Sequence, residues 1–307
     1  MKPEFPEFID STMLAAFKSC PQKMWWQYGE GWEGQGESVD LLAGKSFARG
    51  VEMARRAFWE EGKDKKYCLG LGMEAAAKEY GDFVPAPNKM NKSKERVLEG
   101  LKYYFENFKL EDSKVLMVEG KALVEVGMWR ETEVEHPEGK GKIKYCGTPD
   151  SVEEYAGGVW VADEKTTGKG FGAGWGRKWA LRGQFTGYVW LAQGQEWGRE
   201  CKGALVRGLA FLPKNYDVAF EASGRAGYQM EEWKEQMEKD LKRMVKMWEE
   251  GVWDKNFGDS CEGMTGWASG ACQFLQVCES KDKETWLEIN FKKAKWDPVT
   301  RTREEGK

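Results

Sequence analysis

The sequence predicts an α/β fold with a small mixed central β-sheet flanked by helices. Helical patterns fill the first third of the chain, strand patterns follow, and a helix, a strand and a long helix then alternate. The glycine pair Gly157-Gly158 separates two strand patterns, as a hairpin turn would. The 307 residues show no repeat, low-complexity tract or clear linker, so we expect a single domain over 1–307 with its core at about 41–252.

Capping residues and apolar periodicity predict the helices. Asp10 and Ser11 can cap a short helix that contains the apolar segment 13–17. Pro21 suits the first turn of a second helix that reaches Tyr28, and glycines then predict a loop over 30–40. Longer helices are expected at residues 41–59, 94–108, 179–192 and 228–248.

Apolar and β-branched runs predict the strands. The segment 168–176 is rich in glycine, so we expect it to be a loop between a strand and a helix. The strands are expected at residues 115–119, 122–126, 142–155, 159–162 and 204–212.

Composition excludes several classes of chemistry. Hydrophobic residues make up 41% and charged residues 32%, as is usual for a soluble globular protein. The single histidine, His136, lies in a polar stretch without a nearby serine or cysteine nucleophile motif. A Ser-His-Asp triad, a histidine-rich zinc site and a His-Glu-x-x-His protease are therefore disfavoured. Acid–base and metal chemistry must depend mainly on Asp, Glu, Lys and Cys.

The net charge and the lack of a long apolar run indicate a compartment but do not identify a binding partner. The net charge of −4 gives no global basic field, although a local basic groove can still hold DNA. There is no apolar run of the length, about 18 residues, that a membrane span needs, and the acidic first segment is unlike a signal peptide. We therefore expect a cytoplasmic, reducing compartment, where clustered cysteines indicate metal or cluster ligands more readily than disulfides.

Two carboxylates and a lysine meet on the expected hairpin. Asp150 lies on the first strand, and Asp163 and Lys165 end the second strand. Side chains alternate along a strand, so Asp163 and Lys165 point to the same face, where Asp150 can join them. Hard oxygen donors suit Mg²⁺ or Mn²⁺, and the ammonium can orient a bound water and offset charge on a phosphate. This chemistry is required for phosphodiester hydrolysis, although a surface salt bridge is the simpler alternative for these three residues.

Three motifs together indicate a family. Gly-x-x-Asp ends at Asp150, Asp-x-Lys-Thr spans 163–166, and Gln-x-x-x-Tyr joins Gln184 to Tyr188, one helical turn apart. In this order they resemble the RecB-like branch of the PD-(D/E)XK nuclease superfamily, including phage-encoded exonucleases, CRISPR adaptation nucleases and the AddB nuclease domain. The resemblance covers most of the chain and implies a restriction-endonuclease-like core.

The same resemblance implies the roles of the motif residues. Metal ligands would be Asp150, Asp163 and the main-chain carbonyl of Glu164, and Lys165 would be the catalytic lysine. Gln184 and Tyr188 would contact the DNA strand near the site.

A glycine-rich helix segment upstream departs from the family pattern. The segment 44–52 is similar to the family's helix, which reads Gly-x-x-x-His with a glutamate four residues later. Ala48 occupies the histidine position, so one expected metal ligand is absent, whereas Glu52 is retained. Glu52 either gives a carboxylate to the metal or is a surface charge paired with Arg55 or Arg56. Glu119 is a secondary acidic candidate, with a strand-edge salt bridge as its alternative.

Three of the seven cysteines crowd one C-terminal segment. Cys261, Cys272 and Cys278 follow a C-x10-C and a C-x5-C spacing, and an isolated Cys20-Pro21 lies near the N-terminus. Together they resemble the 4Fe-4S clasp of AddB and the CRISPR-associated nucleases, although the usual C-x2-C is missing. We therefore expect a cysteine-ligated C-terminal segment (261–278) with a structural iron–sulfur cluster. Zinc and unligated buried thiols are the alternatives. The bystander cysteines are Cys68, Cys146 and Cys201.

Aromatic and basic residues follow the expected site. Such a mixture suits stacking on unpaired bases and holding phosphates, with core aromatics and a solvated rim as the alternative. The residues expected to contact DNA here are Lys169, Phe171, Trp175, Arg177, Lys178, Trp179 and Arg182.

The combined expectation is a Mg²⁺- or Mn²⁺-dependent DNA exonuclease of RecB-like type. It would hydrolyse phosphodiester bonds in phage or prokaryotic DNA recombination, repair or replication, in the host cytoplasm if phage-encoded. Its partners would be DNA that is single-stranded or has a free end, and a recombination or replication protein. The alternatives are a non-catalytic DNA-binding protein that retains the nuclease fold, which the Ala48 substitution leaves open, and a zinc-clasped structural protein.

Overall fold

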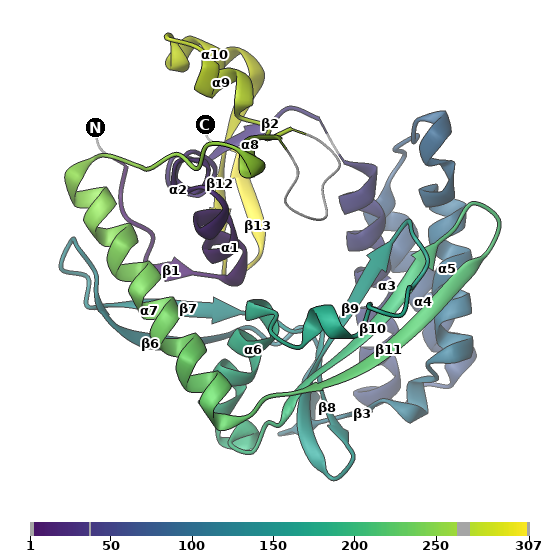
Figure 1. Ribbon diagram of the computed structural model, residues 1–307. Coiled ribbons are helices and arrows are strands. Elements are labelled where there is room, and N and C mark those ends of the chain that lie inside the picture. Colours follow the sequence, from purple (N-terminus) through teal and green to yellow (C-terminus); the bar gives the residue numbers. More distant parts are fainter. Residues whose placement is uncertain (1–2, 37, 263–270, 306–307) are drawn as a thin grey trace. The chain divides into compact units, whose positions relative to one another are not determined.

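The computed structural model describes residues 3–36, 38–262 and 271–305 (Figure 1). The chain divides into two compact units, each assembled from separate stretches of sequence. The central unit comprises 37–126 and 148–227, and the terminal unit comprises 1–36, 127–147 and 228–307. Two compact units can belong to one domain, so the expected single domain over 1–307 stays a prediction.

A five-stranded mixed sheet forms the centre of the central unit. Its strand order is β11-β10-β9-β8-β3, in which β9 and β10 are parallel and all other neighbours are antiparallel. The predicted α/β class with a small mixed sheet is therefore confirmed. The strands of this unit are β3 (Lys114–Val115), β4 (Met117–Val118), β5 (Lys121–Ala122), β8 (Ser151–Tyr155), β9 (Gly158–Thr167), β10 (Gly203–Phe211) and β11 (Tyr216–Gly224).

Helices pack on both faces of this sheet, and for that reason every residue of β10 is buried. Side-chain carboxylate and hydroxyl groups cap two of them, because Asp64 accepts the N–H of Tyr67 and Ser93 accepts the N–H of Arg96. The α-helices are α3 (Val39–Trp59), α4 (Lys65–Tyr80), α5 (Lys94–Asn107) and α6 (Gly183–Gln193). Short 3₁₀ turns are η2 (Pro87–Lys92), η3 (Leu110–Asp112), η4 (Arg177–Trp179) and η5 (Glu196–Gly198).

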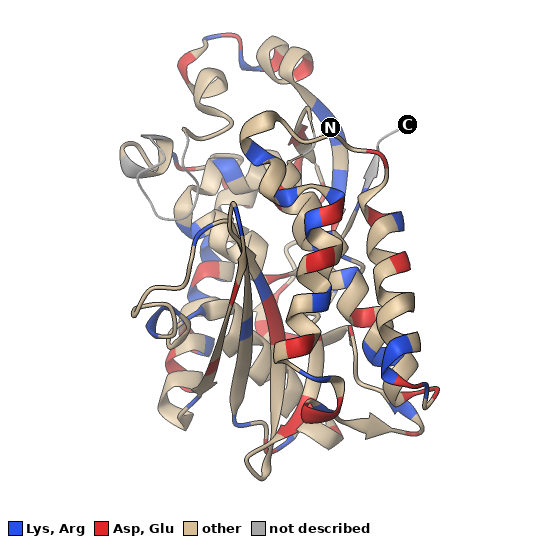
Figure 2. Cartoon of the chain, turned by 90° about the vertical axis from the view of Figure 1, so that its right-hand side faces the viewer, with Lys and Arg blue, Asp and Glu red and all other residues tan. Residues whose placement is uncertain are grey.

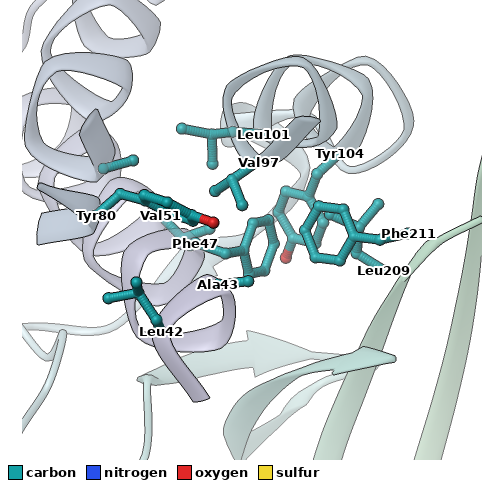
Figure 3. Packing of buried hydrophobic residues seen from close by; sticks show 11 residues of the cluster. Leu42, Ala43, Phe47, Val51, Tyr80, Val97, Leu101, Tyr104, Leu209 and Phe211 are labelled. Atoms are coloured by element: carbon teal, nitrogen blue, oxygen red, sulfur yellow. The ribbon is translucent and has the colours of Figure 1, made fainter. Parts of the chain in front are cut away.

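An apolar cluster of this unit lies between the sheet and the helices α3, α4 and α5. In Figure 3, Phe47 of α3 points between Tyr104 of α5 and Phe211 of β10. The rings of Phe47 and Tyr104 meet edge to face, with centroids 5.1 Å apart. Leu101 also belongs to the cluster and is fully buried. This core fixes α3 and α5 against one face of the sheet.

Glycines allow α3 and α4 to approach closely. A Cβ added to Gly72 would lie 2.6 Å from the carbonyl oxygen of Gly50, so no larger residue fits without a shift. The sequence did not predict α4, because its buried positions are mostly small and give a weak apolar stripe. These positions are Cys68, Gly72, Ala76 and Tyr80.

Two three-stranded sheets form the terminal unit, with strand orders β1-β7-β6 and β13-β12-β2. The strands are β1 (Phe8–Ile9), β2 (Trp32–Gly34), β6 (Met128–Glu135), β7 (Lys142–Gly147), β12 (Phe291–Asp297) and β13 (Thr302–Glu305). The helices are α1 (Ser11–Ser19), α2 (Pro21–Met24), the π-helical turn η1 (Trp25–Gly29), α7 (Gly227–Glu250), α8 (Asp259–Glu262), α9 (Leu275–Glu279) and α10 (Lys283–Asn290).

Local signals predicted the start of this unit well. Asp10 caps α1 through its side chain, and Pro21 occupies the first turn of α2, as expected. The expected loop 30–40 was partly wrong, since it contains β2, whose partner is β12. The expected strand 142–155 was also wrong as one element, because it is two strands interrupted at 148–150.

Basic and acidic residues are interspersed on several helices of the described part of the chain. Figure 2 shows Lys and Arg together with Asp and Glu along the same helices. Within the described residues, no helix is both long and apolar enough to cross a membrane.

The close approach of α3 and α4 predicts opposite effects for two glycines of one helix. Gly72→Ala should lower the free energy of unfolding by about 1–3 kcal/mol, because its methyl group would press on the Gly50 backbone. Gly70 has nothing within 4 Å of an added Cβ. Gly70→Ala is the matched control and should raise stability by up to about 1 kcal/mol through helix propensity. Urea unfolding measures both, and equal effects would contradict the tight crossing.

Candidate active site

The structure brings the predicted carboxylates and lysine together beside β9. Asp150, immediately before β8, accepts a hydrogen bond at Oδ2 from the main-chain N–H of Glu164, at 2.6 Å. Lys165 Nζ lies 2.5 Å from Asp163 Oδ2. The hairpin that joins β8 to β9 turns at Ala156-Gly157, both with positive φ, one residue earlier than predicted.

Strand alternation sorts these side chains onto two faces of the sheet. Asp163 and Lys165 share the face that α6 covers, because Lys165 Nζ lies 5.6 Å from the centroid of the Phe185 ring. Glu164 points to the opposite face, toward α3 and α5. The expectation that Asp163 and Lys165 share a face is met.

The protonation of Asp150 is strongly influenced by its surroundings. Burial, followed by the charges of Asp163, Glu164 and Glu125, raises the pKa of Asp150 well above its ordinary value. A cation placed between these groups would offset their repulsion. The donor set consists of hard oxygens, which Mg²⁺ and Mn²⁺ prefer, so the residues fit such an ion.

The described residues contain no group of three or more His, Cys, Asp or Glu side chains arranged to hold a metal ion. Protein groups already engage the carboxylates in this conformation. Lys165 pairs with Asp163, and the Glu164 N–H bonds Asp150. The metal-ligand roles of Asp150, Asp163 and the Glu164 carbonyl therefore stay predictions.

An ion pair that the sequence did not reveal anchors the side chain of Glu164. Arg55 of α3 donates to Glu164 Oε1 at 2.6 Å, and Tyr104 Oη donates to the same oxygen at 3.1 Å. Arg55 is only 1% exposed. Burial by itself raises the pKa of Glu164, but the charges of Arg55 and Arg207 outweigh burial and lower it to about 2.

A second buried ion pair adjoins the first. Arg207 of β10 donates to both carboxylate oxygens of Glu153 on β8, at 2.9 and 2.5 Å. Ser151 donates to Glu153 at 2.7 Å and accepts from Arg55 at 3.1 Å. The two pairs thus connect α3, β8, β9 and β10. No local motif marks them, because their partners lie 54 to 109 residues apart.

The structure places Gln184 and Tyr188 on one face of α6, as their spacing predicted. Gln184 Nε2 donates to Tyr188 Oη at 3.0 Å, with Tyr188 buried and Gln184 half-buried. Their contact with DNA stays a prediction.

Glu52 of α3 pairs with basic residues of its own helix. Its carboxylate oxygens lie 2.5 Å from Arg49 Nη1 and 3.1 Å from Arg56 Nε. Of the two arginines considered as partners, Arg56 therefore binds Glu52, whereas Arg55 turns inward to Glu164. Whether Glu52 also serves a metal stays a prediction.

The acidic residue beside Asp150 is Glu125, which the sequence analysis did not select. Its main-chain N–H donates to the Asp150 carbonyl at 3.0 Å, and its φ of 49° places it in the left-handed region. Glu119, the candidate that was selected, instead lies exposed in the turn between β4 and β5. The signal in the sequence was that Glu125 is an acidic residue within the expected strand 122–126; its place beside Asp150 comes from the structure.

The basic residues expected to contact DNA flank the loop after β9. Lys169 and Arg182 are exposed at its two ends, and Trp175 is half-buried between them. Trp179 is buried, 5.4 Å from Trp175 between ring centroids.

All four predicted cluster cysteines, Cys20, Cys261, Cys272 and Cys278, belong to the terminal unit and form no disulfide. Burial raises the pKa of both Cys272 and Cys278, and the neighbouring thiols of Cys20 and Cys261 raise it further. The Cys272 N–H donates to the Cys261 carbonyl at 2.9 Å. Residues 263–270, within the expected wrapping segment, lie outside the described residues. The described residues hold no group of three or more potential ligands arranged around a metal position, so the cysteine-ligated segment 261–278 and its iron–sulfur cluster stay predictions, with zinc as the alternative.

Hydrogen bonds join the two chain segments that hold these cysteines. Asn256 Nδ2 and Ser260 Oγ each donate to the Ser19 carbonyl at 2.8 Å, and the Gln22 N–H donates to the Asp254 carbonyl at 3.0 Å. Cys20 is thereby fixed beside the segment that leads to Cys261.

The buried ion pair predicts a strong coupling between Arg55 and Glu164. Arg55→Met should lower the free energy of unfolding by about 3–5 kcal/mol, since it leaves a buried carboxylate without its main partner. Adding Glu164→Gln should recover part of this loss, with a coupling of at least about 1 kcal/mol in a double-mutant cycle. Lys239→Met, at an exposed pair with Glu235, is the control and should change stability by less than about 0.5 kcal/mol. Additive effects of the two buried substitutions would contradict the pair.

Comparison with known proteins assigns the sequence to a family. The sequence matches the model of the PD-(D/E)XK nuclease superfamily over residues 11–279. No curated protein sequence matches it. Among solved structures, similarity is found to a "Putative exonuclease" from Eubacterium rectale, with 13% identity, a TM-score of 0.48 and coverage of 88% of this chain and 92% of that chain. SSO0001 is 15% identical, with a TM-score of 0.29 and coverage of 68% and 87%. On the family match, which spans most of its length, the chain belongs to the PD-(D/E)XK nuclease superfamily.

Proposed function

We propose that the protein is a Mg²⁺- or Mn²⁺-dependent DNA exonuclease of RecB-like type. The observation that supports this most is the meeting of Asp150, Asp163 and Lys165 at one place on the sheet of a superfamily member. The proposed reaction is hydrolysis of a phosphodiester bond by in-line attack of water on phosphorus.

Each residue of this set has a role in the proposal. Asp150, Asp163 and the Glu164 carbonyl would hold the divalent ion, which supplies Lewis acidity and a water of lowered pKa when bound. Lys165 lies beside Asp163 and would place its ammonium against the phosphate, where it offsets the negative charge that develops. Glu52 is a further candidate carboxylate, in place of the histidine that Ala48 replaces.

Residues around the site would hold the DNA strand. Gln184 and Tyr188 lie on one face of α6, and the half-buried amide of Gln184 would contact a phosphate of the strand. Lys169 and Arg182 add positive charge at the ends of the adjoining loop, and Trp175 adds a ring for a base.

The cysteine group is proposed to hold a structural 4Fe-4S cluster. Cys20, Cys261, Cys272 and Cys278 would join the start of the chain to its C-terminal segment, with zinc as the alternative metal. Closing so long a loop would restrict the unfolded chain strongly. The biological setting we propose is phage or prokaryotic recombination, repair or replication in the cytoplasm, with a recombination or replication protein as partner.

Loss of either central residue should abolish cleavage. Asp163→Ala and Lys165→Ala should each lower the rate of DNA hydrolysis by at least about 10²-fold, because one removes a metal ligand and the other a compensating charge. End-labelled linear and circular DNA, single- and double-stranded, with Mg²⁺ or Mn²⁺, measures the rate and separates exonuclease from endonuclease action.

The control for this assay is Lys142→Ala, which removes an ion pair with Glu133 in the terminal unit and should leave the rate unchanged. Full activity of either active-site variant would overturn the assignment. Binding of DNA without any product from the wild-type protein would favour a non-catalytic DNA-binding protein.

Metal analysis tests the cysteine proposal. Anaerobically purified protein should be brown and contain about four irons per chain. Cys261→Ala should lose iron and stability, whereas Cys68→Ala, at a buried bystander of α4, should keep the iron. A colourless wild-type protein with one tightly bound zinc would contradict the cluster. So would a Cys261→Ala protein that is as stable as the wild-type protein.

A further inference from the structure

A glycine of β10 lies directly beside the proposed catalytic lysine. Gly208 pairs with Lys165 in the parallel ladder of β9 and β10, so both positions face α6. A Cβ added to Gly208 would lie 2.5 Å from Phe171 and 2.8 Å from Trp175. The two rings therefore rest on bare backbone next to Lys165, and any other residue at position 208 would displace them.

The rings continue from this point as a connected series around Lys165. Ring centroids lie 4.9 Å apart for Phe171 and Trp175, 5.4 Å for Trp175 and Trp179, and 5.5 Å for Trp179 and Phe185. Phe185 in turn lies 5.6 Å from Lys165 Nζ. The series thus begins at Gly208, the β10 residue that pairs with Lys165, and ends at Phe185, beside the ammonium of Lys165.

Neighbouring residues hold Trp179, at the buried end of the series, whereas Phe171 and Trp175, at the other end, are partly accessible. Arg225 donates to the Trp179 carbonyl at 2.8 Å and to Thr186 Oγ1 at 2.9 Å, which ties the loop to α6. Lys178 Nζ lies 4.4 Å from the Trp179 centroid, and burial, followed by Arg182, lowers its pKa to about 8. Phe171 and Trp175 are only half-buried.

We propose that Phe171 and Trp175 form a stacking wall for an unpaired base of the DNA strand, and that Gly208 sets the position of this wall. The inference rests on the proposed nuclease function and specifies which part of the substrate the loop receives. Accessible aromatic rings beside a phosphate-binding ammonium match the chemistry of an unpaired nucleotide, whose base stacks while its phosphate pairs with the cation. The two rings contact Gly208, which pairs with Lys165 in the sheet. The wall therefore holds the nucleotide that adjoins the scissile bond.

Binding of a fluorescent base tests the wall independently of cleavage. The probe is a single-stranded oligonucleotide with 2-aminopurine at its terminal nucleotide, titrated with the Lys165→Ala protein in Mg²⁺ so that it is not degraded. Stacking should quench the probe. Adding Trp175→Ala or Phe171→Ala should remove most of the quenching and weaken binding about tenfold, and Gly208→Ala should have the same effect because it displaces both rings.

Two comparisons complete the test. Trp286→Ala, at a partly exposed tryptophan of α10, should leave quenching and affinity unchanged. An abasic terminal nucleotide should weaken binding to the parent protein but not to its Trp175→Ala form. Unchanged quenching and affinity in both Trp175→Ala and Phe171→Ala would overturn the wall, whether or not Gly208→Ala folds. Absence of cleavage by the wild-type protein would instead count against the nuclease function, since the quenching result does not depend on hydrolysis.

Discussion

The buried ion pair between Arg55 and Glu164 anchors β9, the strand that carries the proposed active site. On β9, Glu164 stands between Asp163 and Lys165, and its side chain points to the opposite face. An ion pair of 2.6 Å on that face adds a side-chain anchor to the ladders that join β9 to β8 and β10, and together they fix the rotation of the strand about its own axis. The orientations of Asp163 and Lys165, and of the Glu164 carbonyl between them, follow from that rotation.

Buried charges of this kind are expensive and are tolerated only when they are well satisfied. Removing an ion pair from water costs several kcal/mol for each ion, and only close geometry with additional hydrogen bonds offsets this cost. Here Tyr104 adds a hydrogen bond to Glu164, and the pair of Arg207 and Glu153 adjoins. We interpret the network as a device for geometry more than for stability, because it joins two helices, α3 and α5, to three strands at the level of the proposed catalytic residues.

Much of the candidate site could be predicted from the sequence, because the orientation of its side chains follows from the periodicity of strands and helices. Strand alternation predicted that Asp163 and Lys165 share a face, and helical spacing predicted that Gln184 and Tyr188 lie on one face of their helix. The ion pairs of Arg55 were not predictable, since their partners are separated by about a hundred residues and no pattern within β9 indicates them. Helix α4 was missed for a related reason, because glycine and alanine at its buried positions serve close helix packing and give little apolar signal. The pairing of β2 with β12 was missed as well, because it joins segments at opposite ends of the chain and no local pattern indicates it.

The central claim is that Asp150, Asp163 and the Glu164 carbonyl form a divalent-metal site beside Lys165. A crystal structure of the protein grown with Mn²⁺, with anomalous scattering recorded for the metal, tests this claim most directly. The account predicts an anomalous peak bound by these three oxygen donors, with the Lys165 ammonium released from Asp163 toward the phosphate position. An Mn²⁺ peak bound by other residues, in a protein that cleaves DNA, would contradict it.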